Sequence, residues 1–116
     1  MRRRGEENMN QYNILLQLLK SRRYITIKAT GNSMLPTIKS GDNLIVDSNL
    51  ENLKIGDIVL YSEITKKTEI FIVHRIVACV EDKIYLTKGD NNNMYDKPVR
   101  KSKIIGRIIE IQSAED

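Results

Sequence analysis

The stretch Gly31-Asn32-Ser33-Met34-Leu35-Pro36-Thr37 lies between two segments whose residues favour β-strands, Tyr24–Ala29 and Leu44–Asp47. Glycine and asparagine both tolerate positive φ angles, so the pair before Ser33 predicts a tight turn. Pro36 cannot continue a helix or a strand ladder, and it restricts the residue before it to extended conformations. The sequence therefore predicts that Ser33 lies on a short, stiff loop beside a strand end, with its hydroxyl exposed. Most serines in such turns only cap or line a loop, so this stretch alone does not identify a nucleophile.

The segments around this loop predict a mainly β fold with one N-terminal helix. Leucine and isoleucine recur at helical spacing in Asn10–Lys20, and the basic residues after them suit the negative end of a helix dipole. Beyond the helix, short β-branched or alternating runs are separated by turn residues, which is typical of an antiparallel, barrel-like fold. The expected strands are Tyr24–Ala29, Leu44–Asp47, Asp57–Tyr61, Ile70–Val80, Lys83–Thr87 and Ile104–Ile111. A turn is expected at residues 65–68 and a polar loop at Lys88–Pro98, and Gly106 is expected to mark a bulge or a close approach of strands.

Length and composition indicate one domain with a modest, aliphatic core. The chain has 116 residues, of which 41% are hydrophobic and 29% are charged, as in a soluble globular protein. Cys79 is the only cysteine, so no intrachain disulfide can form. We expect residues 1–9 to be a flexible tail and residues 10–116 to fold as a unit.

The charge pattern bears on partners and location. The net charge is +4, and several basic residues gather near the N-terminus. No apolar run approaches the roughly 20 residues that cross a bilayer, and no signal peptide is evident. We therefore expect a cytoplasmic protein, or one held peripherally at a membrane face. The helix of residues 10–20 either packs on the core or contacts a membrane surface or a substrate, and its pattern leaves both interpretations open.

Three residue types that support nucleophilic catalysis occur in this chain. Ser33 needs a neighbouring base to take its proton before it can attack. His74 is the only histidine, and histidine is the natural general base near neutral pH. Because it lies in an apolar strand, a buried structural histidine is the alternative interpretation. Two carboxylates follow on the polar loop, Asp90 and Asp96, and either could orient an imidazole as the acid of a serine triad does.

Several short stretches follow one another in a recognisable order and spacing. They are Gly31–Thr37, Ser40–Asp47, Gly56–Tyr61, Ile72–Val77 and Leu86–Asn92. Together they resemble the signal peptidase I family, and in particular its Ser-His branch of the endoplasmic reticulum, archaea and some Gram-positive bacteria. That branch has His-Arg where the Ser-Lys branch has Lys-Arg. The resemblance covers about residues 30–106, and no single stretch is specific by itself.

The resemblance implies a serine endopeptidase that cleaves a leader or signal-type peptide after small residues, with residues 10–116 as its catalytic domain. Ser33 would be the nucleophile and His74 the general base. Asp96 would orient the imidazole, and Asp90 would support the loop by accepting backbone hydrogen bonds, although the reverse assignment of the two aspartates stays open.

The same resemblance leaves the oxyanion hole incomplete. The backbone N–H of Ser33 is the natural donor. Many family members add a serine hydroxyl two residues before the nucleophile, where this chain has Gly31, and Asn32 or Thr30 could substitute for it. Family members are also usually anchored by membrane helices, so either an anchor was removed or the chain is a soluble relative.

A peptide or precursor protein is the expected partner, added in extended form beside a strand. No cofactor is expected, and no metal either, because the chain has no phosphate-cradling glycine loop and no ligand spacing. One alternative is a non-catalytic or self-cleaving regulatory domain related to the SOS repressors, which share the Gly-x-Ser-Met loop; His74 in place of lysine argues against it. Another is a small basic β-barrel that binds nucleic acid or peptide. Its expected interleaving of aromatic and basic residues is weak, so no nucleic acid partner is expected.

Overall fold

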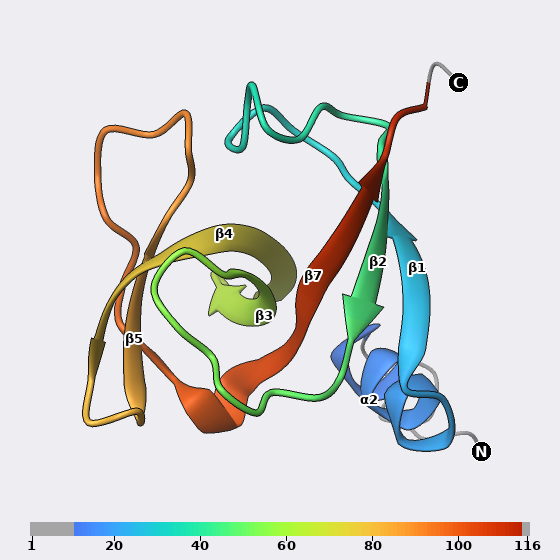
Figure 1. Cartoon of the computed structure of the whole chain (residues 1–116), viewed down its shortest axis with the longest axis horizontal. Helices are drawn as coiled ribbons and strands as arrows, with labels where there is room; N and C mark the ends of the chain where they lie inside the picture. The colour runs from blue at the N-terminus through green and yellow to red at the C-terminus, as the bar shows by residue number, and fades with distance from the viewer. Residues whose placement is uncertain (1–10, 115–116) are drawn as a thin grey trace.

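The computed structural model describes residues 11–114, and its architecture is one seven-stranded antiparallel sheet with a helix beside it (Figure 1). Neighbouring strands follow the order β1-β2-β7-β3-β4-β5-β6. The elements are α2 (Gln11–Ser21), β1 (Tyr24–Lys28), β2 (Asn43–Asp47), β3 (Ile58–Thr65), β4 (Thr68–Val80), β5 (Ile84–Lys88), β6 (Val99–Arg100), the 3-10 helix η1 (Lys101–Lys103) and β7 (Ile104–Gln112). The predicted mainly β fold with an N-terminal helix is confirmed. The predicted tail of residues 1–9 lies outside the described range.

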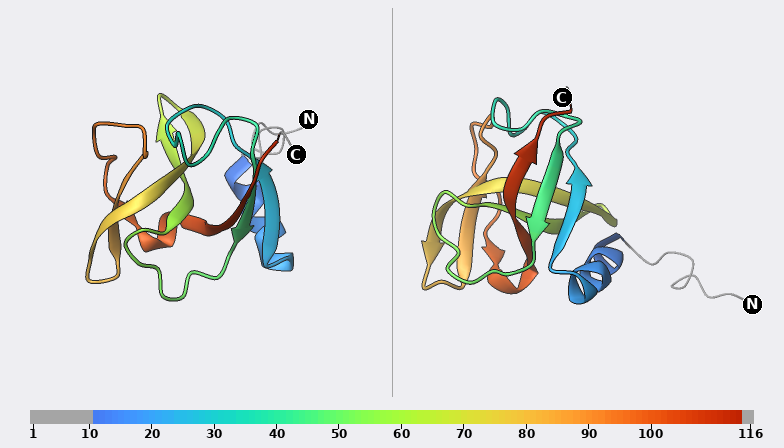
Figure 2. Two further views of the ribbon diagram at one scale, coloured as in Figure 1. Left: turned by 45° about the horizontal axis from the view of Figure 1, so that its top comes forward. Right: turned by 45° about the vertical axis from the view of Figure 1, so that its right-hand side comes forward.

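The hairpin of β3 and β4 forms the centre of a strongly coiled sheet (Figures 1 and 2). Every residue of β3 is paired with β4. Lys66 and Lys67 make the two-residue turn with φ angles of 50° and 68°, and turns of this kind match the right-handed twist of the strands. The predicted turn at residues 65–68 is confirmed. Strand β3 is longer than the predicted Asp57–Tyr61, because the residues after Tyr61 continue the ladder up to the turn.

Several strand edges have no partner strand among residues 11–114, and they include edges of β1 and β4. β1 pairs with β2 alone, so its other edge is open. β4 pairs with β5 only from Arg75 onward, so residues 70–74 have no strand on that side. Open edges of this kind can accept another extended chain.

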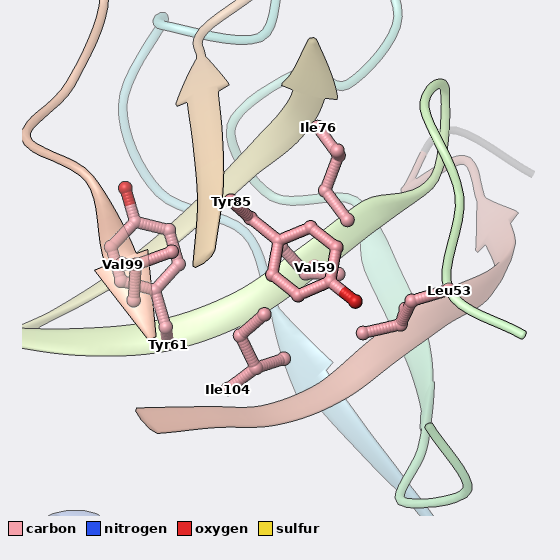
Figure 3. Close-up of a cluster of buried hydrophobic side chains, with 7 residues drawn as sticks. All are labelled: Leu53, Val59, Tyr61, Ile76, Tyr85, Val99 and Ile104. Carbon is pink, nitrogen blue, oxygen red and sulfur yellow. The ribbon is translucent and has the colours of Figure 1, made fainter. Parts of the chain in front are cut away.

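Three groups of buried side chains fill the space around the sheet. The first, shown in Figure 3, consists of Leu53, Val59, Tyr61, Ile76, Tyr85, Val99 and Ile104. The second lies beside α2 and consists of Leu19, Val46, Leu60 and Ile105. The third consists of Met34, Ile38, Leu44 and Ile58. Because Met34 directly follows Ser33, this third group ties the serine-bearing loop to the core.

Helix α2 packs one face on the sheet and leaves its other face exposed. Leu19 is buried and Leu15 contacts the second group, whereas Ile14 and Leu18 are 44% and 40% exposed. The core-packing interpretation of this helix is confirmed for the face that carries Leu19. No helix in the described part of the chain has the length and apolar character that a membrane crossing requires.

Gly106 on β7 lies directly against Val46 and Asp47 of β2. A Cβ built there would lie 2.9 Å from the carbonyl oxygen of Asp47 and would overlap the side chain of Val46. The register of β7 against β3 also shifts beside it, between Leu60 and Tyr61. The prediction of a close approach or bulge at Gly106 is confirmed, and both features occur together.

We expect Gly106→Ala to lower the free energy of unfolding by about 1–3 kcal/mol, because an added methyl group must force β2 and β7 apart. Chemical denaturation of the parent and the variant measures this difference. Gly56→Ala is the matched control, since a Cβ at Gly56 meets nothing within 4 Å and reports only the cost of its positive φ. A Gly106→Ala variant as stable as the parent would contradict the close approach.

Candidate active site

The serine-bearing loop connects β1 to β2 and is held at both ends of its tight turn. Gly31 adopts a φ of +84°, a conformation that glycine takes without strain. The carbonyl oxygen of Asn32 accepts a hydrogen bond from the N–H of Leu35 at 3.2 Å. Met34 is buried, so the turn cannot swing away from the core. The predicted stiff loop is therefore present, with Ser33 half-buried rather than fully exposed.

The loop between β5 and β6 packs directly against the serine loop, and both lie at the same end of the molecule (Figures 1 and 2). The N–H of Asn91 donates to the carbonyl oxygen of Ser33 at 2.8 Å, and its side chain donates to the carbonyl of Asn32 at 3.1 Å. A Cβ at Gly89 would come within 2.6 Å of the Ser33 carbonyl oxygen. Glycine at this position is therefore what allows the two loops to touch.

A chain of hydrogen bonds links the serine, the histidine and one of the two aspartates. Strand β4 presents His74, whose Nε2 lies 3.0 Å from the Oγ of Ser33. The other ring nitrogen, Nδ1, lies 2.6 Å from Oδ2 of Asp96. The histidine side chain is only 10% exposed, and that of Asp96 is 19% exposed. The structure thus brings together three of the four predicted site residues.

Asp90, the fourth, takes part in a neighbouring ion pair instead. Its carboxylate accepts two hydrogen bonds from Arg75, at 2.9 and 2.7 Å, and one from the hydroxyl of Thr37 at 2.6 Å. The hydrogen bonds from the Arg75 guanidinium hold the pKa of Asp90 below its usual range. Asp90 therefore joins the serine loop to β4 through side chains, whereas the sequence predicted backbone partners for it.

Alternation along β4 explains how adjacent residues serve both aspartates. Successive side chains of a strand point to opposite faces. His74 meets Asp96 on one face, and Arg75 meets Asp90 on the other. Lys88, the last residue of β5, donates from its Nζ to the carbonyl of Gly89 at 3.1 Å.

Two residues around Asp96 were missed by the sequence analysis. The hydroxyl groups of Thr87, on β5, and Tyr61, on β3, lie 2.7 and 3.2 Å from the same Oδ2 that faces the histidine. Burial raises the pKa of Tyr61 well above its usual range. Threonine and tyrosine are common in strands, so their presence in the sequence did not indicate a role in the site.

A cleft of about 300 Å³ opens beside the serine and the histidine. It lies between residues 27–29, at the end of β1, and residues 70–74 of β4. Its remaining lining comes from Thr30, Gly31, Ser33, Met34, Ile38, Leu44 and Leu60. An extended peptide laid in this cleft would run between two strand edges that have no other strand partner on that side.

No group of three or more potential metal ligands occurs together among residues 11–114. The arrangement suits chemistry that needs only a nucleophile, a base and an orienting acid, since a serine becomes reactive when a hydrogen-bonded histidine takes its proton. The fold and the site together define a mainly β domain that carries a hydrogen-bonded Ser-His-Asp constellation.

A comparison with protein families identifies the family of this chain. The chain belongs to the Peptidase S24-like family, whose model matches residues 3–109. This match covers the whole sheet up to Ile109, including Ser33, His74 and Asp96.

The chain is also similar to individual proteins whose names are known. The chain is similar to the "Signal peptidase complex catalytic subunit SEC11" of Ogataea parapolymorpha, with 33% identity over 98 residues, covering 66% of this chain and 54% of the relative. The SEC11 subunit of Lodderomyces elongisporus is 46% identical over 67 residues, which are 55% of this chain and 39% of the relative. The predicted likeness to the signal peptidases is confirmed. The chain spans about half or less of the length of these relatives.

Proposed function

We propose that this protein is a serine endopeptidase that cleaves leader or signal-type peptides after small residues, and that residues 10–116 are its catalytic domain. The observation that carries the proposal is the continuous hydrogen-bonded chain from Ser33 through His74 to Asp96. Membership of a peptidase family supports the reaction type. The name of the SEC11 relatives supports a signal-type precursor as the substrate.

In the proposed mechanism, His74 acts first as a base and then as an acid. Its Nε2 takes the proton of the Ser33 hydroxyl as the oxygen attacks the scissile carbonyl carbon. Asp96, at Nδ1, holds the ring in the tautomer whose Nε2 can accept that proton, and it stabilises the imidazolium that forms. The protonated ring then delivers the proton to the leaving amine, and the substrate acyl group stays on Ser33. Water attacks this ester by the same route and releases the second product.

The negative charge of the tetrahedral intermediate needs a donor beside Ser33. We assign its backbone N–H to this role, because an N–H at the nucleophile itself points toward the developing oxyanion in many acyl transfers. Gly31 contributes no hydroxyl. Of the two side chains that could add a second donor, Thr30 lines the cleft, whereas Asn32 does not.

The cleft supports an extended substrate with a small residue before the cut. A peptide lying between β1 and β4 can exchange backbone hydrogen bonds with either edge, and such pairing is independent of side-chain identity. Met34, Ile38 and Leu44 line the cleft near Ser33 and are themselves buried. A large side chain directed at this packed wall would displace core residues, whereas alanine or glycine would not.

A peptide panel tests this function. We expect the full chain to cleave peptides with alanine before the cut at least about tenfold more efficiently than the same peptides with phenylalanine there, because the wall admits no large group. Initial rates measured by chromatography and mass spectrometry give the ratio and the cleaved bond. Equal or faster cleavage of the phenylalanine peptides would contradict the proposed specificity.

We further propose that any membrane contact is peripheral and uses the exposed face of α2. Ile14 and Leu18 are exposed on this helix, and basic residues follow at Lys20 and Arg22. We expect binding to vesicles with anionic lipid at low salt and its loss at roughly 1 M salt, where the screening length falls to about 3 Å. Cosedimentation with anionic and neutral vesicles measures this. Binding that persists at high salt would mean that the contact is not peripheral and electrostatic.

A further inference from the structure

On the side of His74 away from Ser33, three polar groups lie within hydrogen-bonding distance of one carboxylate oxygen. Oδ2 of Asp96 lies 2.6 Å from Nδ1 of His74, 2.7 Å from the hydroxyl of Thr87 and 3.2 Å from that of Tyr61. The two hydroxyl oxygens are 2.9 Å apart. Asp96 lies on the loop after β5, His74 on β4, Thr87 on β5 and Tyr61 on β3.

The hydroxyl groups of Thr87 and Tyr61 support the carboxylate either directly or through one another. An ionised carboxylate only accepts hydrogen bonds, whereas each hydroxyl donates one. Thr87 donates to Asp96, and Tyr61 can then donate either to Thr87 or directly to Asp96. In both cases a run of hydrogen bonds leads from Tyr61 toward the acid.

Both hydroxyl groups lie in the core, where polar atoms are costly without partners. Thr87 is fully buried and Tyr61 is 2% exposed. Figure 3 shows Tyr61 among the apolar side chains of the first buried group. Neither residue lines the cleft beside Ser33. Their hydroxyl groups therefore contact the acid but cannot contact a peptide bound in that cleft.

We propose that Thr87 and Tyr61 are positioning residues for the proposed peptidase site, with Thr87 holding the Asp96 carboxylate in place and Tyr61 supporting Thr87. This inference rests on the proposed function. The carboxylate must keep one oxygen on Nδ1 so that Nε2 stays directed at Ser33. A hydrogen bond from Thr87 prevents rotation of the carboxylate and shares its negative charge, which limits its pull on a proton at the histidine.

Thr87→Val is the first test, because valine keeps the size and branching of threonine and removes only the hydroxyl. We expect kcat to fall about tenfold to a hundredfold, as loss of a hydrogen bond to a charged group predicts. KM should stay unchanged, because Thr87 does not line the cleft. The acidic limb of the pH profile of kcat/KM should move to higher pH, because the less shared carboxylate favours the protonated imidazole.

Three further variants separate positioning from a merely structural role. Thr87→Ser restores the hydroxyl, so kcat and the pH profile should return close to those of the parent. Tyr61→Phe should lower kcat less than Thr87→Val does, because Thr87 still reaches Asp96. In an Asp96→Asn background, Thr87→Val should cause little additional loss, since the residues act through one another.

The inference is overturned if folded Thr87→Val keeps the parental kcat and pH profile, or if Thr87→Ser loses as much activity as Thr87→Val. If Thr87→Val does not fold, Tyr61→Phe decides, and an unchanged kcat and pH profile would overturn the inference. The Ser33→Ala variant distinguishes failure of the positioning roles from failure of the proposed function. An inactive Ser33→Ala together with an unaffected Thr87→Val rejects only the positioning roles, whereas an active Ser33→Ala rejects the proposed function itself.

Discussion

Replacing Ser33 by alanine is expected to lower kcat/KM for a peptide with alanine before the cut by at least about 10⁴-fold, because it removes the hydroxyl that lies 3.0 Å from Nε2 of His74. Folding should be retained, since a half-buried loop hydroxyl contributes little to stability. Rates of peptide cleavage and thermal unfolding curves, measured on the same preparations, give both results.

Ser40→Ala is the matched control for this variant. Ser40 lies on the same loop and is exposed, so its replacement should leave activity and melting temperature near those of the parent. Parental activity in Ser33→Ala would show that the enzyme uses a different nucleophile. A loss of activity in Ser40→Ala equal to that in Ser33→Ala would show that the loop tolerates no change, and the specific role of Ser33 would not stand.

The second large effect is expected at Asp96. Asp96→Asn keeps the shape of the side chain but no longer compensates the imidazolium and favours the wrong tautomer, which costs about 10⁴-fold in kcat in a serine triad. We expect this variant to fold and to be almost inactive. Turnover and melting temperature are the two measurements.

Asp90→Asn provides the contrast, because its partners are Arg75 and Thr37. We expect this variant to lose roughly 1–3 kcal/mol of unfolding free energy, the cost of weakening hydrogen bonds to a partly buried charge. The lowered pKa of Asp90 makes this contribution depend on pH. It is fully present above the unfolded pKa of about 3.9 and is lost as the pH falls through the lower folded pKa. The parent and Asp90→Asn should therefore become similar in stability at acidic pH.

The two aspartate variants also show which outcome contradicts the assignment. If Asp90→Asn is stable and inactive while Asp96→Asn still cleaves, the two roles must be exchanged. If both variants cleave at near-parental rates, Ser33 and His74 act as a dyad and need no third residue.

Local sequence patterns predicted most of the elements, because alternation and turn chemistry act over a few residues. The turn before Ser33 and the turn at residues 65–68 are local features of this kind. At Gly106 the sequence signal was a glycine within a strand, although its contacts are with the distant Val46 and Asp47. Strand β6 was not predicted, because its two residues are too few to show alternation. Its pairing depends on β5, which the sequence does not place beside it.

The partners within the site depend on contacts between distant segments, and this limited the sequence analysis. The sequence offered two aspartates for one histidine. The choice between them depends on how the loop of residues 89–98 crosses β4, where Arg75 reaches Asp90. Thr87 and Tyr61 were not singled out because both residue types are ordinary in strands. Only the fold shows that their hydroxyl groups converge on one oxygen of Asp96.

The measurement that tests the central proposal most directly is detection of the acyl intermediate. The full chain is mixed with a cleavable peptide, quenched with acid within one turnover, digested and analysed by mass spectrometry. We predict that Ser33 carries the acyl group of the amino-terminal product, and that His74→Ala does not accumulate this ester because its serine is not activated. Peptide cleavage with the acyl group on another residue, or equal acylation of Ser33 in His74→Ala, would contradict the proposed Ser33–His74 chemistry.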